Sequence, residues 1–278
     1  MLKYRVISFP LLVAFLAGIF FWPAGGPWLF AAAAILLITS ALYELGKLFA
    51  TVGFANSPIG LAVVGFISSL LLLTPSYRVH LVPLREGIIL FLIFLLFCFW
   101  ITILRRRTEG AKRCAGSFAL FFFGWIPFIM LALIYRHVSP LIFAFVVCTT
   151  KAMDTGGYIF GMLASKLPGG NHKIVPNISP KKSWEGFIGG LLLSLAVGWL
   201  FCRFAPIWAP RATMMAAGIF SLGSFLGDLT ESSLKRAAGV KDSGRWLPGM
   251  GGTLDLVDSF IYNGMIFWLL LPFLKRMM

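Results

Sequence analysis

The fold class of this chain is decided by stretches such as residues 186–202, which read Gly186-Phe-Ile-Gly-Gly-Leu-Leu-Leu-Ser-Leu-Ala-Val-Gly-Trp-Leu-Phe-Cys202. No charged side chain interrupts this run, and its length approaches the ~20 residues with which a helix crosses a bilayer. Similar runs recur along a sequence that is 59% hydrophobic and 12% charged, with a mean hydropathy of +0.90. This composition excludes an ordinary soluble globular domain. The chain is therefore predicted to be an all-α polytopic membrane protein.

Nine apolar runs predict about nine transmembrane helices. They cover residues 7–22, 27–43, 54–74, 88–104, 115–135, 140–161, 186–202, 212–229 and 256–274. The first run is interpreted as a retained helix, because a tight turn follows it instead of the small-residue cleavage site of a signal peptide.

The distribution of cations predicts an orientation. With the N-terminus in the cytoplasm, most of the 24 Lys and Arg residues fall in cytoplasmic loops, as the positive-inside rule requires. The two long polar loops, about 162–185 and 230–255, then face the cytoplasm together. The net charge of +14 is spread over loops between hydrophobic spans, which favours contact with anionic lipid over nucleic-acid binding.

Polar motifs gather in the second half of the chain. This predicts N-terminal transmembrane helices at 1–114 and a site-bearing transmembrane region at 115–278, within a single membrane domain. In the first half, Glu44, Glu86 and Glu109 each lie in or beside a loop with a nearby cation. They are interpreted as solvated charges.

The densest charge lies in residues 228–258, which hold five of the ten carboxylates and four of the five aspartates. A bilayer protein carries such charge only where it faces water, a partner or a substrate. Carboxylates prefer hard cations such as Mg²⁺, and Lys or Arg pair with phosphate oxygens. The window favours a site for a metal-bound polyphosphate, with a solvated loop as the alternative.

Individual residues within this window have predicted roles. Asp255 and Asp258, three residues apart at the predicted start of the last helix, should project from one face and are candidate Mg²⁺ ligands. Asp228, at the end of the preceding helix, is a candidate third ligand. Candidates for contact with phosphate are Lys235, Arg236 and Lys241, with Gly251 and Gly252 letting the backbone approach.

Two polar motifs precede this window. Lys151 and Asp154 share a face of the sixth predicted span, as a structural ion pair or as part of a site. The adjacent Gly156-Gly157 suits helix packing or a phosphate equally.

Further along, Ser179-Pro180 is predicted to form the N-cap and first position of a helix. Its free amides, with Lys181 and Lys182 alongside, would bind an anion. The alternative is a capped helix with ordinary cytoplasmic lysines.

At these residues the sequence resembles the phosphatidate cytidylyltransferases, also called CDP-diacylglycerol synthases. Their signature runs Ser-x-Leu-Lys-Arg, four residues, Lys-Asp, then Pro-x-His-Gly-Gly-x-x-Asp-Arg-x-Asp. The corresponding segments are Ser232-Ser-Leu-Lys-Arg236, Lys241-Asp242 and Pro248-Gly-Met-Gly-Gly-Thr-Leu-Asp-Leu-Val-Asp258. Two more family elements resemble Ser179-Pro-Lys-Lys-Ser-Trp-Glu-Gly186 and Asp154-Thr-Gly-Gly-Tyr158. The resemblance covers most of the polar second half, whereas the first half matches only in being membrane-embedded.

Two positions depart from the signature. Met250 replaces its His, and a thioether cannot take over a titrating role of that imidazole. Leu256 replaces its Arg, which removes one candidate phosphate contact. The aspartates and Lys241 remain, so the resemblance implies an active variant.

The resemblance implies transfer of the cytidylyl group of CTP to phosphatidic acid, giving CDP-diacylglycerol and pyrophosphate. It implies Mg²⁺, with or without a monovalent cation, on Asp228, Asp255 and Asp258. The implied catalytic residues are Asp228, Lys235, Lys241, Asp242, Asp255 and Asp258. The implied substrate-binding residues are Asp154, Ser179, Lys181, Lys182, Ser232, Arg236, Gly251 and Gly252. A homodimer in the bacterial cytoplasmic membrane is implied as well.

Three alternatives remain open at this point. A CTP-dependent lipid kinase, or a cytidylyltransferase for another lipid phosphate, would use the same chemistry. A cation-coupled transporter belongs to a different class, and it would favour charges near the middle of several spans within a repeated architecture. The clustering of charge in two loops, without a visible repeat, argues against transport.

Overall fold

In a computed structural model, the structure describes residues 17–54, 58–73, 112, 115–116, 118–244 and 251–277. All regular elements in these ranges are helices, which confirms the all-α prediction. The predicted spans 7–22 and 88–104 lie wholly or mostly outside the described residues.

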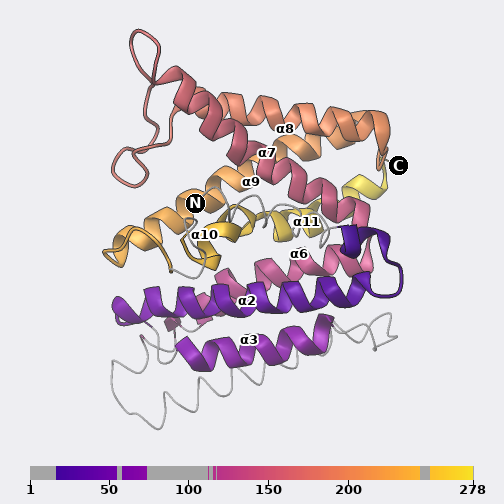
Figure 1. Cartoon of the computed structure of the whole chain (residues 1–278), viewed down its shortest axis with the longest axis vertical. Helices are drawn as coiled ribbons and strands as arrows, with labels where there is room; N and C mark the ends of the chain where they lie inside the picture. Colours follow the sequence, from indigo (N-terminus) through magenta and orange to yellow (C-terminus); the bar gives the residue numbers. More distant parts are fainter. Residues whose placement is uncertain are drawn as a thin grey trace, which may run out of the picture.

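The described helices run in order from α2 to α11. Their bounds are α2 (Gly26–Thr51), α3 (Pro58–Leu73), α6 (Ile126–His137), α7 (Pro140–Ala164), α8 (Trp184–Phe204), α9 (Pro210–Ala237), α10 (Thr253–Val257) and α11 (Asn263–Lys275). A π-helical turn, η1 (Phe121–Trp125), precedes α6, and a 3-10 turn, η2 (Asp258–Phe260), separates α10 from α11. Figure 1 shows α7, α8 and α9 on one side of the molecule, α2 and α3 on the other, and α6, α10 and α11 between them.

Within the described part of the chain, five helical segments are long and apolar enough to cross a membrane. They are Gly26–Thr51, Phe118–His137, Trp184–Phe204, Pro210–Ala237 and Thr253–Lys275. Helix α7 is not among them, although its 25 residues would span a bilayer, because Lys151 and Asp154 lower its hydropathy. These segments define a multi-pass membrane protein.

Two polar segments differ from the sequence-based expectation. Residues 230–237 are not loop but the last turns of α9, which runs to Ala237. Their i,i+4 pairs support this extension: Ser232 donates to Asp228, and Lys235 forms an ion pair with Glu231. The predicted last helix is divided, because η2 separates α10 from α11. Asp255 and Asp258 therefore do not share one continuous helix.

Close packing of α7 against α8 depends on glycine. A Cβ at Gly190 would lie 2.5 Å from the backbone oxygen of Met153, and one at Gly156 would lie 2.8 Å from Cα of Gly190. Any larger side chain would push the two helices apart. Gly156 thus serves packing. The close contact between α7 and α8 places the polar connection between these helices beside α9.

Candidate active site

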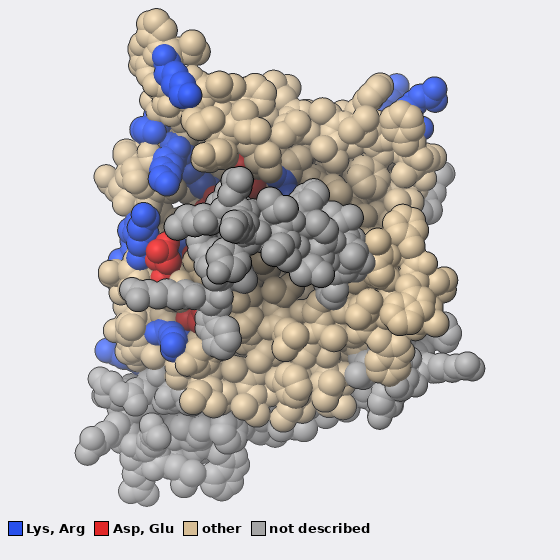
Figure 2. Space-filling model, viewed as in Figure 1, with Lys and Arg blue, Asp and Glu red and all other residues tan. Residues whose placement is uncertain are grey.

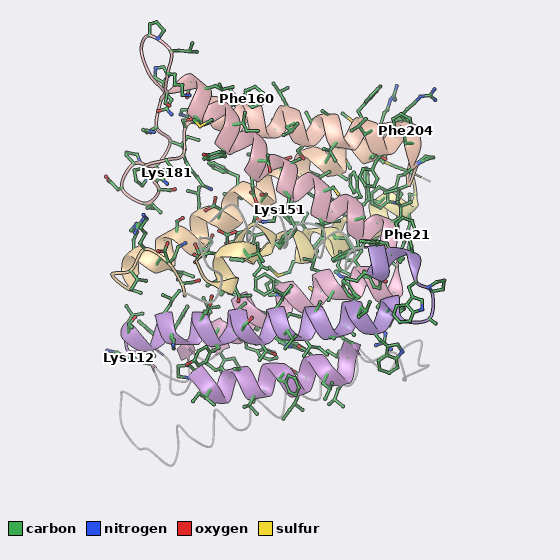
Figure 3. The ribbon with its side chains drawn as sticks, viewed as in Figure 1. Phe21, Lys112, Lys151, Phe160, Lys181 and Phe204 are labelled. Atoms are coloured by element: carbon green, nitrogen blue, oxygen red, sulfur yellow. The ribbon has the colours of Figure 1, made fainter. Side chains whose placement is uncertain are left out.

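Lys and Arg side chains lie at both ends of the helices, and most of those visible in Figure 2 lie at one end. Figure 2 shows Lys and Arg along the side of the molecule where, in Figure 1, the α7–α8 connection and the ends of α2 and α9 lie. Carboxylates are visible between these cations. Figure 3 shows Lys181 on that connection, whereas Lys151 lies among the helices.

A cavity of about 500 Å³ opens at this end, between α7, α8, α9 and the connection of residues 165–183. Its polar lining includes five residues that the sequence proposed for the site: Asp154, Ser179, Lys181, Lys182 and Asp228. Lys173 lines it too, and sequence reasoning missed this residue. Apolar side chains such as Met153 and Phe225 complete the wall. The cavity thus combines cations and carboxylates with an apolar surface, as a phosphate-bearing lipid requires.

Lys182 and Asp228 join the α7–α8 connection to α9 across this cavity. The Nζ atom of Lys182 lies 2.9 Å from Oδ2 of Asp228 and donates to the backbone oxygen of Phe225 at 3.2 Å. It also lies 4.4 Å from the centroid of the Phe225 ring. The Lys182 side chain is 15% exposed, so this cation is held in place rather than free in solvent.

Lys151 and Asp154 belong to a larger network. Lys151 Nζ donates to Oδ2 of Asp154 at 3.1 Å, and to the Leu256 backbone oxygen and Ser259 Oγ at 2.9 Å each. Ser224 of α9 donates to the other Asp154 oxygen at 2.8 Å. This pair is therefore more than an i,i+3 contact, because it ties α7 to α9 and to η2.

Asp258 of η2 lies beside the Lys151 network, because Lys151 donates to Leu256 and Ser259 on either side of it. Its carboxylate lies within electrostatic range of Asp228, Asp154 and Lys151. Its Oδ1 atom accepts the Ser259 amide at 2.6 Å. Hard carboxylate oxygens are the donors that Mg²⁺ prefers. Among the described residues, however, no three carboxylate, His or Cys side chains already stand close enough to hold a metal ion.

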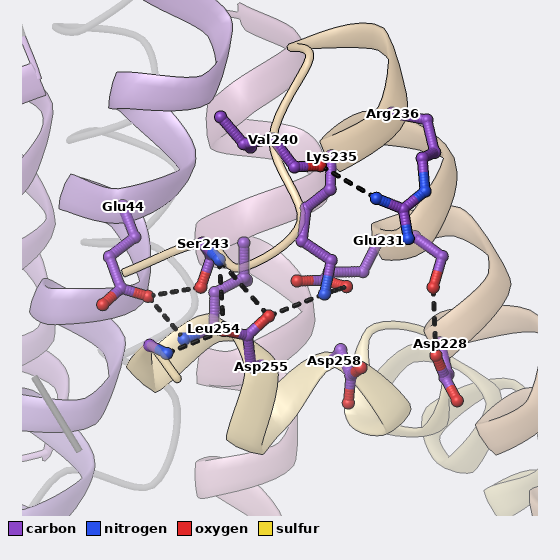
Figure 4. A network of polar contacts seen from close by, with 12 residues as sticks. Glu44, Asp228, Glu231, Lys235, Arg236, Val240, Ser243, Leu254, Asp255 and Asp258 are labelled. Atoms are coloured by element: carbon purple, nitrogen blue, oxygen red, sulfur yellow. Dashed lines mark hydrogen bonds and ion pairs between the residues drawn. The ribbon is translucent and has the colours of Figure 1, made fainter. Parts of the chain in front are cut away.

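Asp255, predicted to share a metal ion with Asp228 and Asp258, belongs to a network with Lys235 and Ser243 (Figure 4). Its Oδ1 atom lies 2.6 Å from Lys235 Nζ, and its Oδ2 accepts the amides of Gly252 at 2.7 Å and Ser243 at 3.1 Å. Lys235 also pairs with Glu231, which is completely buried. Both Asp255 oxygens thus accept from donors in this structure, and its role as a metal ligand stays a prediction.

Lys235 is held by carboxylates, and its predicted phosphate contact stays a prediction. Its side chain is 12% exposed and already faces two carboxylates. Within the described residues, the lysines that line the cavity are Lys173, Lys181 and Lys182. Of these, Lys182 pairs with Asp228, which leaves Lys173 and Lys181 to face an anionic substrate.

The structure corrects the interpretation of Glu44, which lies in the first half of the chain. This residue of α2 is not a solvated charge, because it is 1% exposed and contacts residues 243, 253 and 254 directly. Its carboxylate accepts the amides of Thr253 and Leu254 and the hydroxyl of Ser243. Only the tertiary fold reveals this, because about 200 residues separate the partners.

The start of α8 also differs from the prediction. Ser183, not Ser179, is the N-cap, and its hydroxyl accepts the Gly186 amide at 3.2 Å. Ser179 and Pro180 lie in a turn ahead of the helix, which still places Ser179 at the cavity. The α7–α8 connection is further fastened by Glu185, which accepts from the His172 amide and contacts His172 Nδ1 at 2.6 Å.

The remaining predicted residues lie away from the cavity lining. Lys241 and Asp242 are exposed in the turn after α9, and Arg236 donates to the backbone oxygens of Ile178 and Val240. Gly252 is buried against Glu44 and Ser243, so its backbone is not open to a phosphate. Gly251 adopts a φ of 90°, which favours glycine. Met250 lies outside the described residues, and Leu256 is exposed.

Together, these features define a helical membrane protein with a cation- and carboxylate-lined cavity at one end of the bundle. Comparison with known proteins assigns it more closely: the model of the cytidylyltransferase family matches residues 3–274. The chain therefore belongs to the cytidylyltransferase family.

Similarity to individual relatives is regional. The chain is 34% identical over 179 residues to the phosphatidate cytidylyltransferase of Mycobacterium bovis, covering 61% of this chain and 56% of that protein. It is 50% identical over 113 residues to the phosphatidate cytidylyltransferase of Staphylococcus haemolyticus, covering 39% of this chain and 40% of that protein. The matched regions thus span about half or less of these curated relatives.

Proposed function

We propose that this protein transfers the cytidylyl group of CTP to phosphatidic acid, giving CDP-diacylglycerol and pyrophosphate. The observation that carries the proposal is the cavity where Lys173, Lys181 and Lys182 meet Asp154 and Asp228 at one end of a membrane bundle. A lipid phosphate and a nucleotide triphosphate are both polyanionic, and a cationic cavity beside the bilayer can receive both. The names of the similar Mycobacterium and Staphylococcus proteins support this substrate pair.

In the proposed reaction, a phosphatidate oxygen attacks the α-phosphorus of CTP and pyrophosphate leaves. Phosphoryl chemistry of this kind depends on positioning and charge neutralisation more than on covalent help from the protein. Lys173 and Lys181 would contact the triphosphate from the α7–α8 connection, and Lys182 would fix the carboxylate of Asp228. No general base is needed, because phosphatidate attacks as its anion.

Mg²⁺ would be held by Asp228 and Asp258, whose oxygen donors suit this ion. When bound, it would neutralise charge on the phosphates as the α-phosphorus is attacked. Asp154 would support this pair from α7, where Lys151 and Ser224 orient it. Asp255 would act on the fold of the segment rather than on the metal.

The wider arrangement is also part of the proposal. Nine transmembrane helices with a cytoplasmic N-terminus would place this cavity at the cytoplasmic face, where CTP is available. We further propose a homodimer in the bacterial cytoplasmic membrane, as the family resemblance implies.

The test uses purified protein in detergent, phosphatidic acid, Mg²⁺ and CTP labelled separately at the α- and γ-phosphorus. Cytidylyl transfer places the α label in lipid and releases the γ label as pyrophosphate. Asp258→Asn and chelation by EDTA should each lower this rate by at least about 100-fold. Arg203→Gln, a charge change at the opposite end of α8, is the control. Label from the γ position in lipid would mean a kinase, and absence of turnover with folded protein would refute the proposal.

A further inference from the structure

Glu44 is a buried carboxylate that the proposed reaction does not use. It lies on α2, is 1% exposed, and has three hydrogen-bond donors around it. Oε1 accepts the Thr253 amide at 3.0 Å, while Oε2 accepts the Leu254 amide at 2.8 Å and the Ser243 hydroxyl at 2.9 Å. Figure 4 shows these contacts at the start of α10.

The chemistry of this contact requires a carboxylate. All three partners donate, and an ionised carboxylate is purely an acceptor. A glutamine would present an NH₂ group to at least one of these donors, leaving that donor without an acceptor in a buried place. Among the described residues no Lys or Arg forms an ion pair with Glu44, and two backbone amides and one hydroxyl donate to its carboxylate.

The residues that Glu44 contacts, Ser243, Thr253 and Leu254, lead directly to the candidate site. Ser243 and Gly252 donate their amides to Asp255, which also binds Lys235, so both residues converge on α10. Asp258 follows directly after α10, between Leu256 and Ser259, and Lys151 joins both of these residues to Asp154 of α7. A shift of α10 would therefore move Asp258 relative to the carboxylates of α7 and α9.

We propose that Glu44 is a positioning residue, which anchors α10 from the N-terminal half of the chain and thereby sets the position of Asp258. This inference rests on the proposed cytidylyl transfer. It predicts a loss in the chemical step rather than in nucleotide binding, because Glu44 touches neither the cavity lining nor its lysines.

The first experiment measures hydrogen exchange of the whole protein in detergent and does not depend on activity. Glu44→Gln should accelerate exchange of the Thr253 and Leu254 amides at least about tenfold, as expected when a buried donor loses its acceptor. Exchange in α8 should stay unchanged. Leu42→Ala, a cavity-forming change at a buried neighbour on α2, is the matched control and should leave exchange at residues 253–254 unaltered. Unchanged exchange in Glu44→Gln would overturn the anchoring role.

The second experiment separates positioning from general stabilisation. In Glu44→Gln, kcat should fall roughly 10- to 100-fold, with KM for CTP changed by less than about threefold. Glu44→Asp keeps the charge on a shorter side chain and should recover part of kcat. Equal losses in Glu44→Gln and Leu42→Ala, or a fall confined to KM, would overturn the inference. If the wild-type protein transfers no cytidylyl group, the proposed function fails, whereas the exchange data still decide the anchoring by Glu44.

Discussion

Replacing Lys235 by methionine tests whether this lysine holds the fold or faces the nucleotide. Its ammonium group lies between Glu231, which is fully buried, and Asp255, whose side chain is 11% exposed. Removing the cation leaves two carboxylates close together out of water, without the ammonium group that both contact. Breaking a buried ion pair in this way costs about 3–5 kcal/mol.

The matched change is Lys182→Met. Lys182 has a single carboxylate partner, Asp228, whose side chain is 35% exposed and can be rehydrated. A pair of this kind is worth about 1 kcal/mol or less. Both substitutions remove an ammonium group. Lys235→Met should nevertheless lower the free energy of unfolding several times more than Lys182→Met.

Thermal unfolding in one detergent, followed by tryptophan fluorescence, measures this difference. At about 2–4 °C per kcal/mol for chains of this size, Lys235→Met should lower Tm by roughly 6–20 °C. Lys182→Met should lower it by at most ~4 °C. The double variant Lys235→Met with Glu231→Met removes one of the stranded carboxylates and should regain much of the loss.

A different outcome would refute this reasoning. If Lys235→Met unfolds at the wild-type temperature and raises KM for CTP, Lys235 contacts the nucleotide instead of holding Asp255. The role implied by the family resemblance would then stand.

The glycine contact between α7 and α8 and the cavity lysines give two further predictions. Gly190→Ala should destabilise the protein by about 2 kcal/mol or more, because its Cβ would meet the Met153 backbone oxygen, whereas Gly218→Ala should be neutral or stabilising by up to ~1 kcal/mol. Equal melting temperatures for these two variants would contradict the close approach of the helices. Lys173→Ala should raise KM for CTP about threefold to tenfold without changing Tm, because an exposed lysine contributes charge to the cavity and little to packing. Kinetics as a function of salt check this prediction, and a KM equal to that of the wild type would exclude Lys173 from the anion site.

Local patterns in the sequence predicted the class of fold and the general place of the site. Apolar runs such as 186–202 became helices, because membrane helices satisfy their own backbone hydrogen bonds wherever the run is long enough. The grouping of Asp154, Ser179, Lys181, Lys182 and Asp228 at one cavity agrees with the motifs found in the chain. These residues lie near the ends of predicted spans, so the ends of the helices bring them together.

Boundaries and partners were harder to predict. Polar residues after 229 suggested a loop, but i,i+4 pairs on α9 carry the helix to Ala237. Ser179 and Ser183 are equally good caps by residue type, and tertiary contacts place the helix start at Trp184. In the same way, Asp255 looked equivalent to Asp258 by spacing, although Asp255 pairs with Lys235 and Asp258 lies beside the Lys151 network.

The sequence by itself determined that this is a helical membrane protein and predicted phosphate-directed chemistry, because hydropathy and residue type act locally. The tertiary structure decided which charged side chains pair with one another and which line the cavity. Lys235 and Asp255 neutralise one another, and Glu44 is buried under α10 despite its distance along the chain. The physical reason is that a carboxylate or ammonium group takes its role from the donors and charges packed around it, and those come from segments whose proximity exists only in the folded protein.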